Sequence, residues 1–216
     1  MLNDLKPKQK QAILRGVVHV GALLPLVLLY IDYYTYNLGA NEIRAATLRT
    51  GKPAIILLML SLAVTPLMTI FGWRQIVVLR KPLGLYAFLY AAIHFLIFVG
   101  IDYGFEWGAL PAAILDKRYA LVGLIAFLLL IPLAMTSNKW SMKRLGKRWK
   151  QLHRLVYLIG VLAVIHYIWL VKNAYTEPLI LSFLLLIMLV VRVPAVKTAI
   201  VAQRRAWEKR GRVVEG

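Results

Sequence analysis

The chain has 216 residues, of which 61% are hydrophobic, and its mean hydropathy is +0.70. Because soluble proteins carry roughly 45–50% apolar residues, this excess predicts a membrane protein whose surface faces lipid. Cysteine is absent, which excludes disulfides, thiolate metal sites, iron–sulfur clusters and covalently attached haem. Any metal in this protein must therefore be bound by nitrogen or oxygen ligands.

The net charge of +18 at pH 7 could indicate nucleic-acid binding. However, the basic residues lie in loops and tails between long apolar runs, which is typical of a membrane-topology signal. We therefore expect a lipid bilayer around this protein and no nucleic-acid partner.

Six apolar runs are long enough to cross a hydrocarbon core, which takes about 20 residues. In chain order, the predicted spans are 11–31, 53–71, 83–101, 119–136, 154–172 and 178–196. Arg192 and Pro194 interrupt the end of the sixth span, and we expect the Arg192 guanidinium to reach the membrane interface. Pro25, Pro66 and Pro132 lie inside spans, where neighbouring helices can satisfy the carbonyls that a proline leaves free.

The charges between the spans predict how the chain is oriented in the membrane. With the N-terminus inside, the inner segments hold most of the 27 Lys and Arg, while the outer loops hold as many acids as bases. We therefore predict an all-α bundle of six transmembrane helices with both termini cytoplasmic. Residues 1–10 would form an N-terminal tail, 11–196 the transmembrane domain and 197–216 a basic C-terminal tail.

His94 and His166 lie in the third and fifth spans, beyond the span midpoints by about 3 Å and about 4.5 Å. Both spans run from inside to outside, so the two imidazoles are expected at one depth on parallel helices. Ionisable groups at this depth are usually functional or paired. The pattern predicts that the two side chains are the axial ligands of one haem iron. The alternative is that each histidine hydrogen-bonds a neighbouring hydroxyl or carbonyl.

Three further side chains are candidates for a haem site near the cytoplasmic face. His153 precedes His166 by about 20 Å along the helix, but the two rings point about 140° apart on an ideal helix. A second haem would therefore need helix distortion or binding on another side. Arg80 is a candidate to pair with a haem propionate, or else is a topology charge. His19 could oppose His153, although a packed histidine is the expected role.

Two other classes of protein fit a histidine-containing bundle. A small proton-coupled transporter or channel would line its path with the histidines, and a scaffold subunit would merely pack them. A transporter predicts more polar residues in mid-span than Ser61, Thr65 and Thr69 provide. Both alternatives predict a colourless protein. No GxGxxG, P-loop or HExxH pattern occurs, so we expect neither NAD(P)H binding nor metalloprotease activity.

The stretches GKRWKQLHRLVYL (Gly146–Leu158) and IHYIWLVK (Ile165–Lys172) resemble the MsrQ family. This family is the haem-binding membrane subunit of the bacterial periplasmic protein-methionine-sulfoxide reductase system. RKPLGLYAFLYAAIHF (Arg80–Phe95) and NLGANEI…RTGK (Asn37–Lys52) fit the same family. MsrQ in turn resembles the ferric reductase and NADPH oxidase membrane domain, whose third and fifth helices each carry two haem-binding histidines. The resemblance implies a multi-pass protein of the bacterial inner membrane.

Carried over residue by residue, the resemblance makes His94 the outer ligand on helix three and makes His153 and His166 the pair on helix five. Arg80 stands at the place of the inner histidine on helix three, so the resemblance implies one haem b, or two if His153 finds another partner. It also implies association with FMN, for which no residues are assigned.

The resemblance further implies an electron-transfer subunit rather than the catalytic subunit. Electrons would come from quinol or a separate cytoplasmic flavin reductase, because the chain is expected to have no flavin domain of its own. They would pass to MsrP, a periplasmic molybdopterin reductase that repairs oxidised methionine. The expected docking surface for that partner is the outer face, including Asp102, Glu106 and Asp116.

Overall fold

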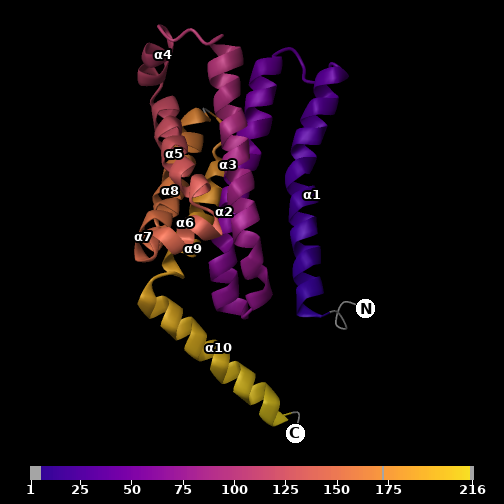
Figure 1. Cartoon of the computed structure of the whole chain (residues 1–216), viewed down its shortest axis with the longest axis vertical. Helices are drawn as coiled ribbons and strands as arrows, with labels where there is room; N and C mark the ends of the chain where they lie inside the picture. The colour runs from indigo at the N-terminus through magenta and orange to yellow at the C-terminus, as the bar shows by residue number, and fades with distance from the viewer. Residues whose placement is uncertain (1–5, 172, 215–216) are drawn as a thin grey trace.

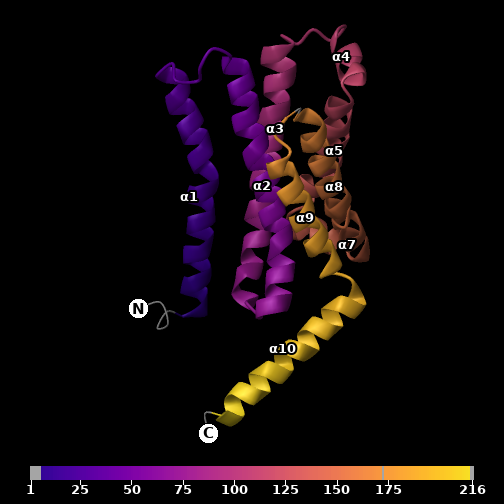
Figure 2. The same ribbon diagram turned by 180° about the vertical axis from the view of Figure 1, so that it is seen from behind.

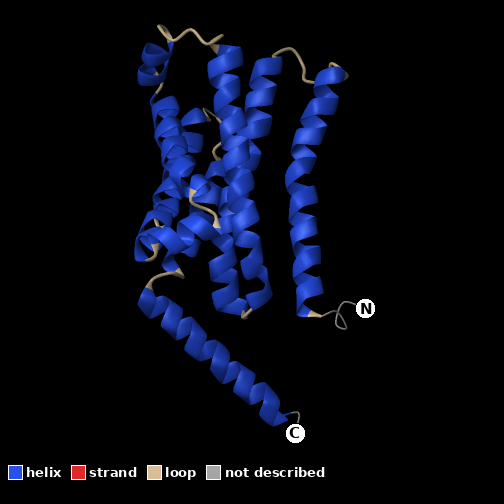
Figure 3. Cartoon of the chain, viewed as in Figure 1, coloured by secondary structure: helices blue, strands red, loops and turns tan. Residues whose placement is uncertain are grey.

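The computed structural model describes residues 6–171 and 173–214, and in this part of the chain all regular structure is helical (Figure 3). The α-helices are α1 (Pro7–Tyr34), α2 (Glu42–Phe71), α3 (Arg80–Leu96), α4 (Leu110–Asp116), α5 (Arg118–Met135), α6 (Lys139–Leu145), α7 (Lys147–His153), α8 (Leu155–Leu170), α9 (Thr176–Val190) and α10 (Pro194–Val214). A 3₁₀ segment, η1 (Arg74–Leu79), precedes α3, and a π-helical segment, η2 (Ile97–Asp102), follows it. The all-α prediction is confirmed. The outermost residues of both predicted tails, and Lys172 at the end of the fifth predicted span, lie outside the described residues.

In the described part of the chain, five helical segments are long and apolar enough to cross a membrane. They are α1, α2, the segment Arg74–Asp102 that contains α3, α5, and the segment Lys147–Leu170 that contains α7 and α8. The pair α9 and α10 qualifies as a sixth span only when the two are taken together across an 80° bend. The chain is therefore a multi-pass membrane protein, as the apolar runs predict.

The sixth predicted span, 178–196, differs from the structure at its end. Helix α9 stops at Val190 and α10 starts at Pro194, because proline lacks the N–H of a helix interior and disfavours helical backbone at the residue before it. With 15 residues, α9 is about 22 Å long, which is shorter than a hydrocarbon core of about 30 Å. Helix α10 leaves the bundle obliquely (Figures 1 and 2).

The two ends of the bundle differ in charge. We call the end at which α1 begins the basic end. The Lys- and Arg-containing segments η1, the start of α3 and α10 also lie there (Figure 1). Among the described residues, the opposite end carries the connections 35–41 and 103–109, together with 171 and 173–175. At the opposite end, acids pair with bases of a neighbouring helix, namely Asp32 with Arg49 and Glu177 with Lys52.

Helix α1 stands at one edge of the bundle in both views, and Ala22 is its one buried residue within the described chain (Figures 1 and 2). Val18 and Leu26 pack against the main core, while exposed apolar side chains such as Val17, Val20 and Val27 are available to lipid. Two polar contacts attach it to α3. The Tyr90 hydroxyl donates to the Ala22 carbonyl at 2.6 Å, and His19 Nδ1 lies 2.8 Å from the Tyr86 hydroxyl. In lipid such groups have only protein partners, so these bonds hold α1 in place.

Helix α2 runs through the centre and connects the two halves of the bundle. One face packs Leu57 and Leu58 with Ala87 and Tyr90 of α3 in the main core. Another face packs Ile55, Met59 and Leu62 with Val164 of α8 and Leu185 of α9. Through this double packing, α3 and α8 both contact the central helix α2. Helix α3 carries His94 and α8 carries His166.

Pro66 interrupts the hydrogen bonds of α2, and a side chain from another helix repairs the gap. A proline has no N–H for the carbonyl four residues before it, which here is Leu62. The Arg192 guanidinium donates to this Leu62 carbonyl and, at 2.6 Å, to the Met188 carbonyl. Its charge also lies over the Tyr157 ring, 5.1 Å from the ring centre. The expectation that a neighbouring helix satisfies a carbonyl freed by proline therefore holds for Pro66.

We predict that Arg192→Met lowers the free energy of unfolding by about 1–3 kcal/mol, because it leaves the Leu62 carbonyl without a donor. In a Pro66→Ala background the loss should be smaller, since residue 66 then supplies its own N–H to that carbonyl. Thermal or denaturant unfolding in detergent measures both effects, with exposed Arg205→Gln as the control. Equal losses in the two backgrounds would show that the bond to Leu62 is not the stabilising contact.

Candidate functional site

The structure brings His94 and His166 together inside the bundle. His94 comes from the last turn of α3, and His166 comes from the second half of α8. Their ring centres are 6.2 Å apart and their planes are nearly perpendicular, at 86°. Both side chains are partly buried. The matched depths inferred from the two apolar runs thus correspond to a direct approach of the two rings.

Each of the two rings is held by a backbone carbonyl of a neighbouring helix. His94 Nδ1 lies 2.9 Å from the carbonyl oxygen of Thr47 on α2, and His166 Nδ1 lies 2.7 Å from that of Tyr119 on α5. A carbonyl oxygen can only accept a hydrogen bond, so Nδ1 must be the protonated nitrogen in both rings. Nε2 of each ring then keeps a free lone pair, which is the form of imidazole that binds a metal.

The distance between the two ring centres is that expected for two imidazoles on one metal ion. A metal–nitrogen bond is about 2 Å and the nitrogen lies about 1 Å from the ring centre, so two opposed imidazoles on one ion have centres ~6 Å apart. The 6.2 Å found here agrees with that spacing. The imidazole nitrogens are also among the metal ligands that remain possible in a chain without cysteine. The predicted alternative, a hydrogen bond to a carbonyl, is also present, but it occupies only Nδ1.

The surroundings of the pair are apolar and aromatic. Phe95, next to His94 in the sequence, stacks on Phe127 of α5 at 4.9 Å between ring centres, and Phe88 also stacks on Phe127, at 6.0 Å between ring centres. Directly after α3 the chain continues as the π-helical segment η2, a rare geometry that recurs at functional sites. A planar, largely apolar cofactor is compatible with such surroundings.

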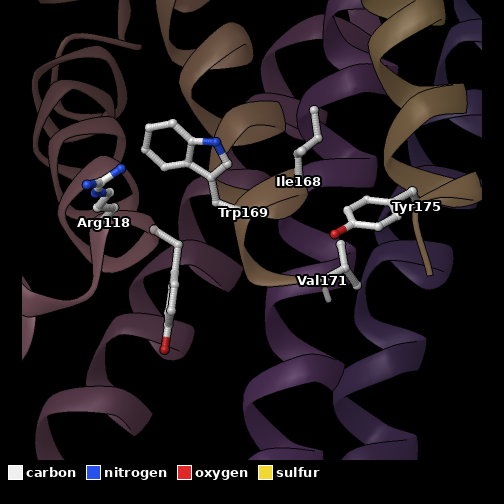
Figure 4. A pocket seen from close by; sticks show the side chains of 6 residues that line it. Arg118, Ile168, Trp169, Val171 and Tyr175 are labelled. Carbon is white, nitrogen blue, oxygen red and sulfur yellow. The ribbon is translucent and has the colours of Figure 1, made fainter. Parts of the chain in front are cut away.

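A hollow opens at the opposite end next to this pair (Figure 4). It has a volume of about 610 Å³ and is lined by Arg118, Tyr119, Ile168, Trp169, Val171 and Tyr175. Tyr119 also supplies the carbonyl that binds His166, so the hollow adjoins the site. Its lining combines one guanidinium with aromatic rings. Arg118 and Trp169 lie on one side in the close view, and Tyr175 lies on the other.

The other predicted site residues do not join the pair. His153, at the end of α7, lies 3.1 Å from the Thr136 hydroxyl through Nε2 and stacks on Trp149 at 4.0 Å. Arg80, at the start of α3, donates to the Thr65 hydroxyl. His19 contacts Tyr86 of α3. Arg154, between α7 and α8, keeps α-helical backbone angles, and Lys147–Leu170 forms one helical segment. The expected angle of about 140° between the rings of the fifth span stays a prediction.

The connection from η2 to α5 contributes to the surface of the opposite end. The acids predicted for docking, Asp102, Glu106 and Asp116, are all exposed there. Trp107 is 71% exposed and Phe105 is 51% exposed, which places large aromatic rings beside these carboxylates. Lys117 donates to the Tyr103 hydroxyl at 2.8 Å, and this bond raises the pKa of Lys117. The lysine therefore stays charged among the acids.

Sequence reasoning missed four residues that hold the histidines: Thr47 and Tyr119, whose carbonyls accept the bonds, and Gly51 and Gly123, which lie against the rings. A backbone carbonyl leaves no trace in residue type, so Thr47 and Tyr119 give no signal. The sequence spacing gives a weak signal, because in both pairs the residue whose carbonyl accepts the bond precedes its histidine by 47 positions.

Known proteins resemble this chain over most of its length. A family model described as the ferric reductase like transmembrane component matches residues 50–164. The protein-methionine-sulfoxide reductase heme-binding subunit MsrQ of Rhodospirillum rubrum is 44% identical over 192 residues, covering 88% of this chain and 92% of that protein. The protein of the same name in Deinococcus radiodurans is 45% identical over 167 residues, covering 76% of this chain and 81% of that protein.

A third protein of that name, from Herminiimonas arsenicoxydans, is 37% identical over 203 residues, covering 93% of this chain and 88% of that protein. Identity at this level over nearly the whole chain confirms the resemblance drawn from the motifs around His94, His153 and His166. The chain belongs to the MsrQ family of ferric reductase-like transmembrane proteins.

Proposed function

We propose that this protein binds one haem b between His94 and His166 and transfers electrons across the bacterial inner membrane to a periplasmic methionine-sulfoxide reductase. The approach of the two rings, each with Nδ1 bound to a carbonyl, is the observation that carries this proposal. The names of the relatives, which are heme-binding subunits of such a system, support it.

The role of each residue follows from the contacts of the two rings. Bound between the two Nε2 atoms, the haem iron would supply a centre that gains and loses single electrons. The Thr47 and Tyr119 carbonyls hold the imidazoles neutral and fix their orientation. The stacked aromatic side chains of α3 and α5 would provide apolar surroundings for the haem.

The site lies nearer the opposite end than the basic end. Thr47 and Tyr119 both belong to the first two turns of their helices, and both α2 and α5 begin at the opposite end. We propose that the basic end faces the cytoplasm, in accord with the positive-inside rule. Electrons would then leave on the periplasmic side, where the exposed acids and Trp107 form the docking surface for MsrP.

We propose a single haem because the contacts of His153 are with Thr136 and Trp149, and those of Arg80 are with Thr65. These contacts account for both side chains as packed polar groups of the basic end. The quinol or flavin-reductase donor and the FMN association stay predictions of the family resemblance.

The haem assignment predicts that His94→Ala and His166→Ala each cause the purified protein to lose its haem, and with it the Soret absorbance, because a site without one of its two imidazoles binds haem much more weakly. The visible spectrum before and after dithionite measures this, with His19→Ala as the matched intramembrane control. A colourless wild-type protein, even after reconstitution with hemin, would refute the proposal and favour a proton-pathway function.

The single-haem proposal predicts that His153→Ala leaves one haem per chain, measured as haem content against protein concentration. Its spectrum and midpoint potential should match those of the wild type, since the substitution changes contacts only at the basic end. A halved haem content in this variant would instead establish His153 as a ligand of a second haem.

The partner proposal predicts that neutralising the outer acids weakens docking. In proteoliposomes with a quinol donor, the variant Asp102→Asn/Glu106→Gln/Asp116→Asn should raise the apparent KM for purified MsrP by roughly 3- to 10-fold, because complementary charges speed encounter. Methionine-sulfoxide consumption reports the rate. Glu208→Gln, on α10 at the basic end, is the control. An unchanged KM at low ionic strength would place the docking surface elsewhere.

A further inference from the structure

A glycine lies against each of the two central histidines. A Cβ atom added to Gly51 of α2 would stand 2.9 Å from Cε1 and 3.0 Å from Nδ1 of His94. A Cβ atom added to Gly123 of α5 would stand 2.6 Å from Nδ1 and 2.8 Å from Cε1 of His166. Contacts under 3.0 Å are essentially absent from real proteins. Any larger residue at either position would therefore displace the ring.

Both glycines occupy the same place relative to the hydrogen bond of their histidine. Gly51 lies four residues after Thr47, and Gly123 lies four residues after Tyr119. In a helix each side chain points back toward the N-terminus, over the turn that precedes it. A side chain at 51 or 123 would thus cover the carbonyl to which the imidazole binds. Glycine leaves that carbonyl uncovered, and its second lone pair accepts the Nδ1 hydrogen.

Backbone conformation does not explain these two glycines. Both lie inside α-helices, and neither has a positive φ, in contrast to Gly39, Gly72 and Gly146. Within a helix glycine is less favourable than alanine, so helix stability alone would favour the larger residue. The space that each imidazole needs against its neighbouring helix is the physical reason for both.

We propose that Gly51 and Gly123 are positioning residues for the haem ligands, an inference that rests on the proposed function of His94 and His166. Each glycine forms, with the carbonyl one turn before it, a cradle that sets the plane and the tautomer of one imidazole. The two cradles have the same spacing and the same contacts with Nδ1 and Cε1. The two ligands are therefore held in equivalent ways by two different helix pairs, α2 with α3 and α5 with α8.

The experiment compares Gly51→Ala and Gly123→Ala with two matched controls. Gly84→Ala on α3 adds a Cβ at an ordinary 3.5 Å from Ser61 Oγ, and Gly21→Ala on α1 meets nothing within 4 Å. The full-length proteins are purified in detergent, stripped of haem and titrated with hemin. The measurements are hemin affinity, the low-spin spectrum of the oxidised form and carbon monoxide binding by the reduced form.

We expect Gly123→Ala and Gly51→Ala to weaken hemin binding by about 10- to 100-fold, the usual range when a partner that orients a metal ligand is lost. The effect should be larger at 123, where the added atom comes closer. The haem that still binds should bind carbon monoxide, because a displaced imidazole leaves the sixth position open. The controls should match the wild type in all three measurements.

Two outcomes overturn the inference. One is wild-type hemin affinity and spectrum in both glycine variants while the wild-type protein binds haem. The other applies if the alanine variants are unstable. The loss of thermal stability caused by Gly51→Ala in the haem-free protein is then measured with His94 present and in a His94→Ala background. An equal loss of stability with and without His94 would show that Gly51 acts through helix packing. A wild-type protein that binds no haem refutes the proposed function itself, and so is a distinct result.

Discussion

The hydrogen bond from an imidazole Nδ1 to a backbone carbonyl of the next helix is the interaction on which the site depends. An imidazole N–H in lipid has no water to bind, so it must find a partner inside the protein. The Thr47 and Tyr119 carbonyls satisfy this requirement and also decide which nitrogen of each ring carries the proton. The same bond thus lowers the cost of placing His94 and His166 in the membrane and leaves both Nε2 atoms free for a metal.

The rest of the bundle uses the same kind of interaction. The Tyr90 hydroxyl binds the Ala22 carbonyl and joins α1 to α3, while Arg192 binds the Leu62 carbonyl that Pro66 leaves free. Arg204 of α10 reaches the last carbonyls of α2, at Thr69 and Met68. In each case a polar side chain from one helix meets the backbone of another. Such bonds give direction to a bundle whose apolar side chains would pack almost as well against lipid.

The position of the histidine pair constrains the proposed electron path. Because the pair lies near the opposite end, a single haem there is close to the exposed acids of that surface but far from the basic end. A donor that dissolves in the bilayer, such as quinol, can approach through the lipid-facing sides of α5 and α8. A cytoplasmic flavin reductase would dock on the basic end, and its electrons would have to cross most of the bundle. The choice between these two donors stays a prediction of the family resemblance.

Residue type and spacing alone determined the class of this protein, five of its spans and the pairing of His94 with His166. These features depend on hydrophobic length and depth, which are one-dimensional properties of the chain. The bend after Val190, the separate contacts of His153 and Arg80, and the roles of Gly51 and Gly123 were decided only by the tertiary structure. Each depends on which face of a helix meets which neighbour, and on backbone carbonyls that every residue possesses. No pattern of side chains can specify such a contact before the helices are packed.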